Sequence, residues 1–212
     1  MLIGGLLAIA DSLLMLLQFP LPVTSTLVVA FSIALTGGLH VDGVMDTADG
    51  LAVPNTSRRL AVMSDSRMGA FGGMAAVILI LLKVLALAAI TEHRGFVLVL
   101  TSMWGRWAQQ WAIARYPYLK KEGKGAFHKA ALPKPFYTLP GLFVLFSLTG
   151  LLWLSHMISA ELALRTSISG LVMSILTNAY FFKQLGGHTG DTYGAVIEWT
   201  EAFFLCSLSA SF

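Results

Sequence analysis

The sequence is poor in charge and in cysteine. Of its 212 residues only 12% are charged, whereas 56% are hydrophobic, and soluble domains usually carry about 25% charged residues. Because Cys206 is the single cysteine, an internal disulfide and a cysteine-based metal site are both excluded. The low charge and the mean hydropathy of +0.75 exclude an ordinary soluble domain. They indicate instead a protein of the lipid bilayer.

Long apolar runs take the place of the missing charge. A helix needs about 20 predominantly apolar residues to cross a bilayer core of about 30 Å. We predict an all-α, polytopic integral membrane protein, a helical bundle with about seven transmembrane segments: 2–17, 23–39, 69–91, 95–116, 137–157, 165–182 and 195–212. No linker, low-complexity tract or internal repeat divides residues 1–212, so we predict a single domain.

The positive charges predict how the bundle lies in the membrane. If every segment spans, the polar stretches 40–68, 117–136 and 183–194 lie on one side, and they hold most of the Lys and Arg residues. The opposite side holds only Arg94 and Arg165. Since cytoplasmic loops are enriched in Lys and Arg, we expect the polar stretches to face the cytoplasm. These loops also explain the net charge of +3, which therefore gives no reason to expect nucleic acid as a partner.

Three aspartates lie close together in GLHVDGVMDTADGL, at 38–51: Asp42, Asp46 and Asp49. On a helix, their i, i+4 and i+7 spacing places them on one face. Like charges at this spacing repel each other and cost stability unless a cation lies between them. Since oxygen ligands suit a hard divalent cation such as Mg²⁺, we consider the triad a candidate metal site; the alternative is a solvated loop.

The next segment, PNTSRRLAVMSDSRMGAFGG at 54–73, alternates arginine and carboxylate. Arg58, Arg59 and Arg67 are candidates to bind phosphate oxygens, because the planar guanidinium matches phosphate geometry. Asp65 and the members of the aspartate triad are candidates to accept a proton, and the sequence does not decide between them. Such a loop suits a phosphate-ester substrate that is bound through Mg²⁺.

A second group of candidate site residues occurs in LGGHTGDTYGAVIEWTE, at 185–201. Gly187 and Gly190 belong to a flexible stretch leading into a helix, whose N-terminus favours anions. Asp191 is a candidate further metal ligand or base. Glu198 and Glu201 fall inside an apolar segment, where carboxylates are expensive and usually functional.

Two cations and two histidines also need partners. Lys83 and Arg106 lie deep in apolar runs, so we expect them to pair with Glu198, Glu201 or a substrate phosphate. His40 and His188 adjoin the two motifs. For each histidine a local hydrogen bond is the simpler prediction, and metal binding or proton donation is the alternative.

Four sequence blocks resemble the cobalamin synthase family (adenosylcobinamide-GDP ribazoletransferase, cobalamin-5'-phosphate synthase). They are GGLHVDGVMDTADGL at 37–51, RRLAVMSDSRMGAFG at 58–72, GRWAQQWAIARYPYLKKEGKG at 105–125 and LGGHTGDTYGAVIEWTE at 185–201. The blocks occur in the family's order and span most of the chain, which makes the resemblance specific.

The resemblance implies a Mg²⁺-dependent transferase of the bacterial cytoplasmic (inner) membrane that acts late in vitamin B12 assembly. Adenosylcobinamide-GDP would react with α-ribazole, or with its 5'-phosphate, and release GMP. With this chemistry in view, the expected metal ligands are Asp42, Asp46, Asp49 and Asp191; the expected catalytic residues are Asp42, Asp46, Asp49 and Asp65; and the expected substrate-binding residues are Arg58, Arg59, Arg67, Arg106, Gly187 and Gly190.

The chain departs from the family pattern at two places. Ser64 stands where the family commonly has Arg, and the family usually has an additional segment before the span that Met1 enters. The resemblance therefore implies that 1–212 lacks the usual N-terminal segment. The sequence leaves open whether the chain forms a homo-oligomer.

Two other functions compete with this one. A CDP-alcohol phosphotransferase-like enzyme also uses clustered aspartates and Mg²⁺ in a membrane helix, but it would have an Ala-Arg pair after the first Asp-Gly, which this chain lacks. A cation or metabolite transporter would place charged residues along a path at the membrane midplane. Here the charges concentrate in the polar loops, which disfavours transport.

Overall fold

The chain forms a bundle of α-helices. A computed structural model describes residues 2–65, 67–120 and 124–210. In those ranges the helices are α1 (Leu2–Leu16), α2 (Leu21–Leu35), α3 (Leu39–Ala52), α4 (Thr56–Val62), α5 (Ala70–Ala89), α6 (Arg94–Arg115), α7 (Lys124–Ala131), α8 (Leu139–Leu154), α9 (Ala160–Leu185) and α10 (Gly190–Ser209), with the 3-10 helix η1 (Pro135–Thr138) before α8. The predicted all-α fold is confirmed.

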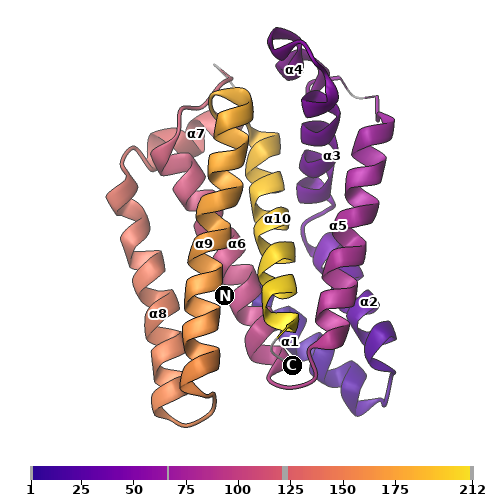
Figure 1. The fold of residues 1–212 in the computed structure, drawn as a ribbon, viewed down its shortest axis with the longest axis vertical. Helices are drawn as coiled ribbons and strands as arrows, with labels where there is room; N and C mark the ends of the chain where they lie inside the picture. Colours follow the sequence, from indigo (N-terminus) through magenta and orange to yellow (C-terminus); the bar gives the residue numbers. More distant parts are fainter. Residues whose placement is uncertain (1, 66, 121–123, 211–212) are drawn as a thin grey trace.

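The long helices lie side by side, with α10 among them (Figure 1). Helix α10 packs against α3, α5, α6 and α9, whereas α1 and α2 occupy the lower part of the view. The polar connections around α4 and α7 and between α9 and α10 gather at the upper end, which we call the polar end. The prediction that these three stretches share one side of the bundle is therefore consistent with the fold.

The predicted count of seven membrane spans is not confirmed. Among the described residues, three helical stretches are long and apolar enough to cross a membrane: Ala70–Ala89, Pro135–Leu154 and Ala160–Leu185. The pair α2 and α3 would make a fourth, bent by 88°. Helices α1 and α2 have 15 residues each and so rise only about 22 Å. Helices α6 and α10 are not among these candidate spans, and both carry charged residues, among them Arg106, Glu198 and Glu201.

The bend between α2 and α3 is built from glycine. Gly37 and Gly38 both have a left-handed backbone, with φ of 61° and 73°, which residues other than glycine rarely adopt. Helix α3 therefore begins inside the bundle and runs to the polar end. The segment 40–68, predicted as a loop, is thus largely helical, and the aspartate triad lies on a packed helix.

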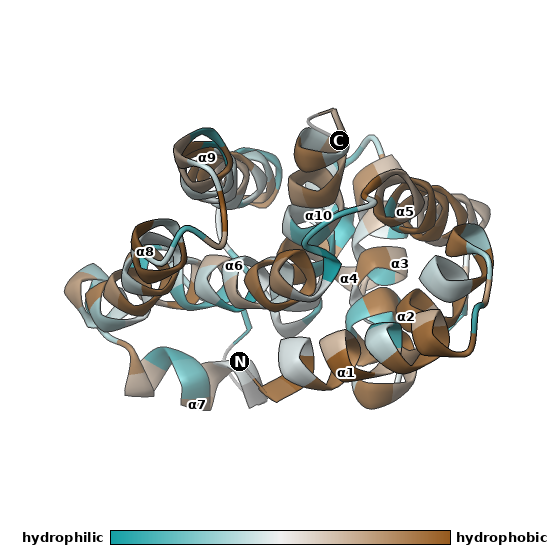
Figure 2. Ribbon diagram, turned by 90° about the horizontal axis from the view of Figure 1, so that it is seen from below, coloured by the Kyte–Doolittle hydropathy of each residue, from teal (hydrophilic) through white to brown (hydrophobic). Residues whose placement is uncertain are grey.

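The interior combines apolar side chains with buried hydroxyl groups and a few paired charges. Figure 2 shows apolar residues over most of α1, α2, α5 and α8, and hydrophilic residues on α7. One buried ion pair ties α1 to α6 at the lower end: Arg94 Nη2 donates to Asp11 Oδ1 at 2.7 Å. Arg94 also donates to the carbonyls of Leu87 and Ile90, so this guanidinium is satisfied within the protein.

Candidate active site

The aspartate triad lies on one face of α3, as its spacing predicts, and that face meets the start of α10. Asp42 is exposed, and Asp46 and Asp49 are half-buried. A Cβ on Gly43 would lie 2.5 Å from the carbonyl oxygen of Asp191, so the backbones of α3 and α10 approach closely at this point. The close approach brings Asp191 beside the triad.

Asp49 differs from its neighbours because both of its oxygens accept backbone hydrogen bonds. Gly69 N donates to Asp49 Oδ2 at 2.7 Å, and Gly72 N donates to Asp49 Oδ1 at 2.8 Å. These amides belong to the first turn of α5, whose N–H groups have no partner within the helix. Asp49 therefore caps α5, a use of this carboxylate that the triad spacing did not reveal.

Asp42, Asp46 and Asp191 lie near Lys120, a lysine that the sequence did not indicate as a site residue. Lys120 Nζ donates to Asp191 Oδ2 at 3.1 Å, and both side chains are partly exposed. Asp46 experiences the charges of Asp42, Asp191 and Lys120. Carboxylates from α3 and α10 thus lie near an ammonium from the segment that follows α6. We call these four residues the acidic cluster: Asp42, Asp46, Lys120 and Asp191.

A backbone bridge positions Lys120. His188 N donates to the carbonyl of Pro117 at 2.9 Å, and Leu119 N donates to the carbonyl of His188 at 2.8 Å. A Cβ on Gly187 would lie 2.6 Å from the carbonyl oxygen of Pro117, so glycine is required for the two backbone segments to meet. The bridge joins distant parts of the sequence, which explains why the pattern of residues alone did not indicate Lys120.

His188 is enclosed by the same bridge. Its ring is fully buried and lies near Tyr116 and Tyr193, and Nδ1 is 3.2 Å from Thr192 Oγ1. Burial lowers the pKa of His188 to about 4, so the imidazole is neutral near pH 7. The structure therefore gives His188 the local hydrogen bond that was the simpler prediction.

The arginines of the polar end have different environments. Arg58 is exposed on α4, whereas Arg59 Nη1 donates to the carbonyl of Gln184 at 2.8 Å and ties α4 to the end of α9. Arg67 forms a bidentate pair with Asp65, with Nη2 and Oδ2 2.7 Å apart. This guanidinium holds the pKa of Asp65 down to about 2.

The remaining predicted residues lie apart from the acidic cluster or take no part in it. Gly190 is the first residue of α10, and a Cβ added to it would meet nothing within 4 Å. Arg106 is half-buried in α6 and contacts His40 rather than the polar end. Lys83 pairs with both Glu198 and Glu201, which confirms the predicted pairing for that lysine.

The acidic cluster fits Mg²⁺ only as part of a larger ligand set. In the described residues, no three His, Cys, Asp or Glu side chains converge closely enough to hold a metal ion by themselves. Mg²⁺ usually keeps several waters and takes one or two carboxylates together with substrate phosphates. One or two of the carboxylates of Asp42, Asp46 and Asp191 would supply that partial set. We therefore expect a metal to bind together with an anionic substrate.

A large, mostly apolar cavity lies elsewhere. It has a volume of about 900 Å³ and lies between α3, α5, α9 and α10, with walls that include Val44, Phe71, Leu176 and Phe203. Its described lining is mostly apolar and includes no cationic side chain to match a phosphate. The acidic cluster, on the other face of α3, is the better candidate for an anion bound through a metal.

Comparison with known proteins identifies close relatives along almost the whole chain. A family model described as cobalamin-5-phosphate synthase matches residues 1–209. A protein of Trichormus variabilis named adenosylcobinamide-GDP ribazoletransferase is 51% identical over 209 residues, which are 99% of this chain and 83% of the relative. Relatives of the same name occur in a Synechococcus species, at 51% identity and covered to 82%, and in Prochlorococcus marinus, at 36% identity over 217 residues. No solved structure matches the chain.

Proposed function

The chain belongs to the cobalamin-5-phosphate synthase family, and from that premise we propose that the acidic cluster is where it joins adenosylcobinamide-GDP to α-ribazole. As a member of this family the chain is a transferase of the late, nucleotide-loop step of cobalamin assembly. The observation that carries the location is the meeting of Asp42 and Asp46 with Asp191 beside Lys120. It is a half-exposed group of hard oxygen ligands at the polar end of a membrane bundle.

The proposed reaction is a substitution at phosphorus. A ribose hydroxyl of α-ribazole, or of its 5'-phosphate, attacks the phosphorus attached to cobinamide. The new P–O bond forms as the P–O bond to GMP breaks, GMP leaves with the electron pair, and the hydroxyl proton passes to a base. Such a step requires charge neutralisation and alignment of the two substrates.

The chain supplies groups for each requirement. One or two of the carboxylates Asp42, Asp46 and Asp191 would hold Mg²⁺, which when bound supplies positive charge to the diphosphate oxygens. Lys120 lies beside these carboxylates and can neutralise a phosphate oxygen once the substrate separates it from Asp191. Arg58, exposed on α4, can bind the guanosine phosphate.

We assign the role of base to a member of the triad rather than to Asp65. A proton acceptor works best when its pKa lies near the operating pH, and the pair with Arg67 lowers the pKa of Asp65 to about 2. Asp65 also uses both oxygens to hold Arg67. Asp46 is half-buried beside Asp42 and Asp191, so it can accept the proton only if the other two carboxylates hold the metal.

The test is product formation by purified protein in detergent or in liposomes. Incubation with adenosylcobinamide-GDP, α-ribazole and Mg²⁺ should release GMP and give the mass of adenosylcobalamin, and chelation of the metal should stop both. The variant Asp46→Asn should lose turnover, whereas Glu161→Gln, at the opposite end of the bundle, serves as the matched control. An Asp46→Asn enzyme with full Mg²⁺-dependent turnover would contradict the proposed site. Parallel reactions with α-ribazole 5'-phosphate identify the preferred acceptor.

We propose further that the polar end faces the cytoplasm of a bacterial inner membrane. The Lys and Arg residues of α4, α7 and their flanking segments support this orientation through the positive-inside rule. A cysteine introduced as Ser57→Cys in a Cys206→Ser background should react with a membrane-impermeant maleimide only in inverted vesicles. Reaction in intact cells would reverse the orientation.

A further inference from the structure

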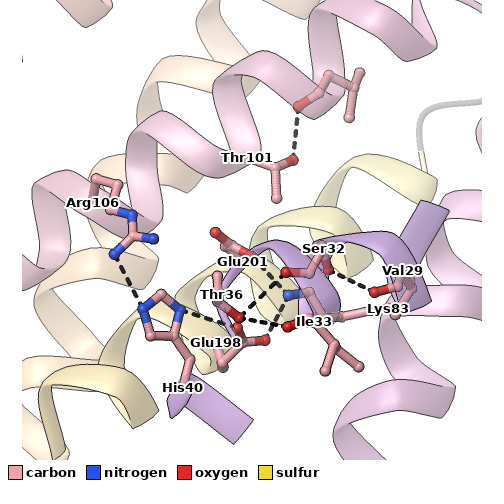
Figure 3. A network of polar contacts seen from close by, with 11 residues as sticks. Val29, Ser32, Ile33, Thr36, His40, Lys83, Thr101, Arg106, Glu198 and Glu201 are labelled. Atoms are coloured by element: carbon pink, nitrogen blue, oxygen red, sulfur yellow. Dashed lines mark hydrogen bonds and ion pairs between the residues drawn. The ribbon is translucent and has the colours of Figure 1, made fainter. Parts of the chain in front are cut away.

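A chain of polar side chains inside the bundle links the start of α3 to three neighbouring helices (Figure 3). Lys83 Nζ, on α5, donates to Glu198 Oε2 at 2.7 Å and to Glu201 Oε2 at 2.6 Å. The other oxygen of Glu198, Oε1, lies 3.5 Å from His40 Nδ1. Arg106 Nη1, on α6, lies 3.2 Å from His40 Nε2. His40 therefore joins α3 to α10 on one side and to α6 on the other.

The chemistry of the partners indicates which ring nitrogen of His40 accepts a hydrogen bond and which one donates. A guanidinium has only donors, so Nε2 of His40 must accept from Arg106. Nδ1, on the opposite side of the ring, can then donate to Glu198. Two cations, Lys83 and Arg106, and two carboxylates, Glu198 and Glu201, thus meet around His40.

The first turn of α3 is held by contacts with neighbouring helices rather than by a capping side chain. The helix follows two left-handed glycines, and no side chain caps its N-terminus. Its far end is held by the hydrogen bonds from Gly69 and Gly72 to Asp49. A Cβ on Gly194 would lie 3.0 Å from the Cα of His40, so α10 passes directly against the residue that begins the network.

We infer that His40 is a positioning residue for the transfer reaction: it fixes the first turn of α3 so that Asp42 and Asp46 face Asp191. His40 lies two residues before Asp42 and does not belong to the acidic cluster. The inference rests on the proposed function and adds to it a residue that acts through the orientation of a helix. The ion pairs of Lys83 fix the position of Glu198, and the contacts of His40 with Glu198 and Arg106 hold the first turn of α3.

The test compares two substitutions of the same residue. Glutamine offers an N–H donor and a carbonyl acceptor, so His40→Gln can keep both contacts, whereas His40→Leu keeps neither. We expect kcat of His40→Leu to fall at least about tenfold while KM for both substrates changes less than about threefold, because the loss affects alignment in the reacting complex. We expect His40→Gln to stay within about threefold of the wild type in both constants.

A second measurement separates positioning from general stability. Hydrogen exchange of the amides in the first turn of α3 should be faster in His40→Leu than in the wild type and should be restored in His40→Gln. Arg94→Met is the control, since it breaks a buried pair at the lower end. It should lower the unfolding temperature while folded enzyme keeps its kcat. If His40→Leu does not fold, His40→Met, with its adaptable unbranched side chain, takes its place.

The outcomes are distinct. Wild-type kcat in His40→Leu, or an equal loss in the Gln and Leu variants, would overturn the inference. Unchanged exchange of the first turn of α3 in His40→Leu would overturn it as well. Absence of product from the wild-type protein would refute the proposed function instead, since the exchange experiment needs no substrate.

Discussion

Gly43→Ala tests whether the approach of α3 to α10 forms the site. The added Cβ would lie 2.5 Å from the carbonyl oxygen of Asp191, whereas ordinary contact begins at 3.4 Å. The obstacle is backbone, so the two helices must separate by about 0.9 Å. A displacement of about 1 Å in a catalytic arrangement can cost about 10²-fold in rate, which corresponds to about 2.7 kcal/mol. We expect kcat/KM to fall by that order, measured as GMP release.

Two other glycines make the test quantitative. Gly73→Ala adds a methyl group with nothing within 4 Å, so it should keep full activity and gain up to about 1 kcal/mol from helix propensity. Gly194→Ala meets the Cα of His40 at 3.0 Å and should give an intermediate loss. Overpacking at Gly43 should also lower the free energy of unfolding by about 1–3 kcal/mol, seen as a lower unfolding temperature. Full activity of Gly43→Ala, or equal losses in all three variants, would refute the reasoning.

Three further changes address charge. The pKa of His188 is about 4 when folded and 6.5 when unfolded, so between those pH values the unfolded chain binds the extra proton. Stability is then present above pH 6.5 and should fall by up to about 3 kcal/mol as pH drops to 4; thermal unfolding of His188→Gln should lose this dependence. Arg94→Met leaves Asp11 buried and unpaired and should cost about 3–5 kcal/mol, whereas the double variant with Asp11→Leu should recover much of it. Lys120→Met should raise KM for adenosylcobinamide-GDP with little change in unfolding temperature, because its contact with Asp191 is partly exposed; an unchanged KM would remove Lys120 from the substrate site.

The spacing of Asp42, Asp46 and Asp49 predicted a shared helix face because helical periodicity is a local property of the chain. The outcome for Asp49 could not be predicted in the same way. Its partners, the amides of Gly69 and Gly72, become available only when α5 begins beside α3. The pairing of Lys83 was predictable, since a buried ammonium must find a carboxylate, but the involvement of His40 depends on the bend at Gly37 and Gly38.

The predicted count of seven membrane spans was not confirmed for a related reason. Hydropathy marks 23–39 as a membrane segment, but two left-handed glycines turn the chain by 88° near its end. The polar helices α6 and α10 are accommodated because their charged residues pair inside the bundle. The partners of each charge are set by packing, so a count made along the sequence could not anticipate them.

The hydrogen bonds at the polar end can also be understood as a matching of helix macrodipoles. Helices α5 and α10 point their N-termini there, each equivalent to about +0.5 charge, and each meets an aspartate, Asp49 or Asp191. Helices α6 and α9 point their negative C-termini there, and each meets a cation: Lys129 donates to the carbonyls of Ile113 and Ala114, and Arg59 to that of Gln184. These partial charges help acidic residues to collect at one end of a membrane protein. They also imply that lengthening or fraying any of the four helices would change the potential that an incoming diphosphate meets.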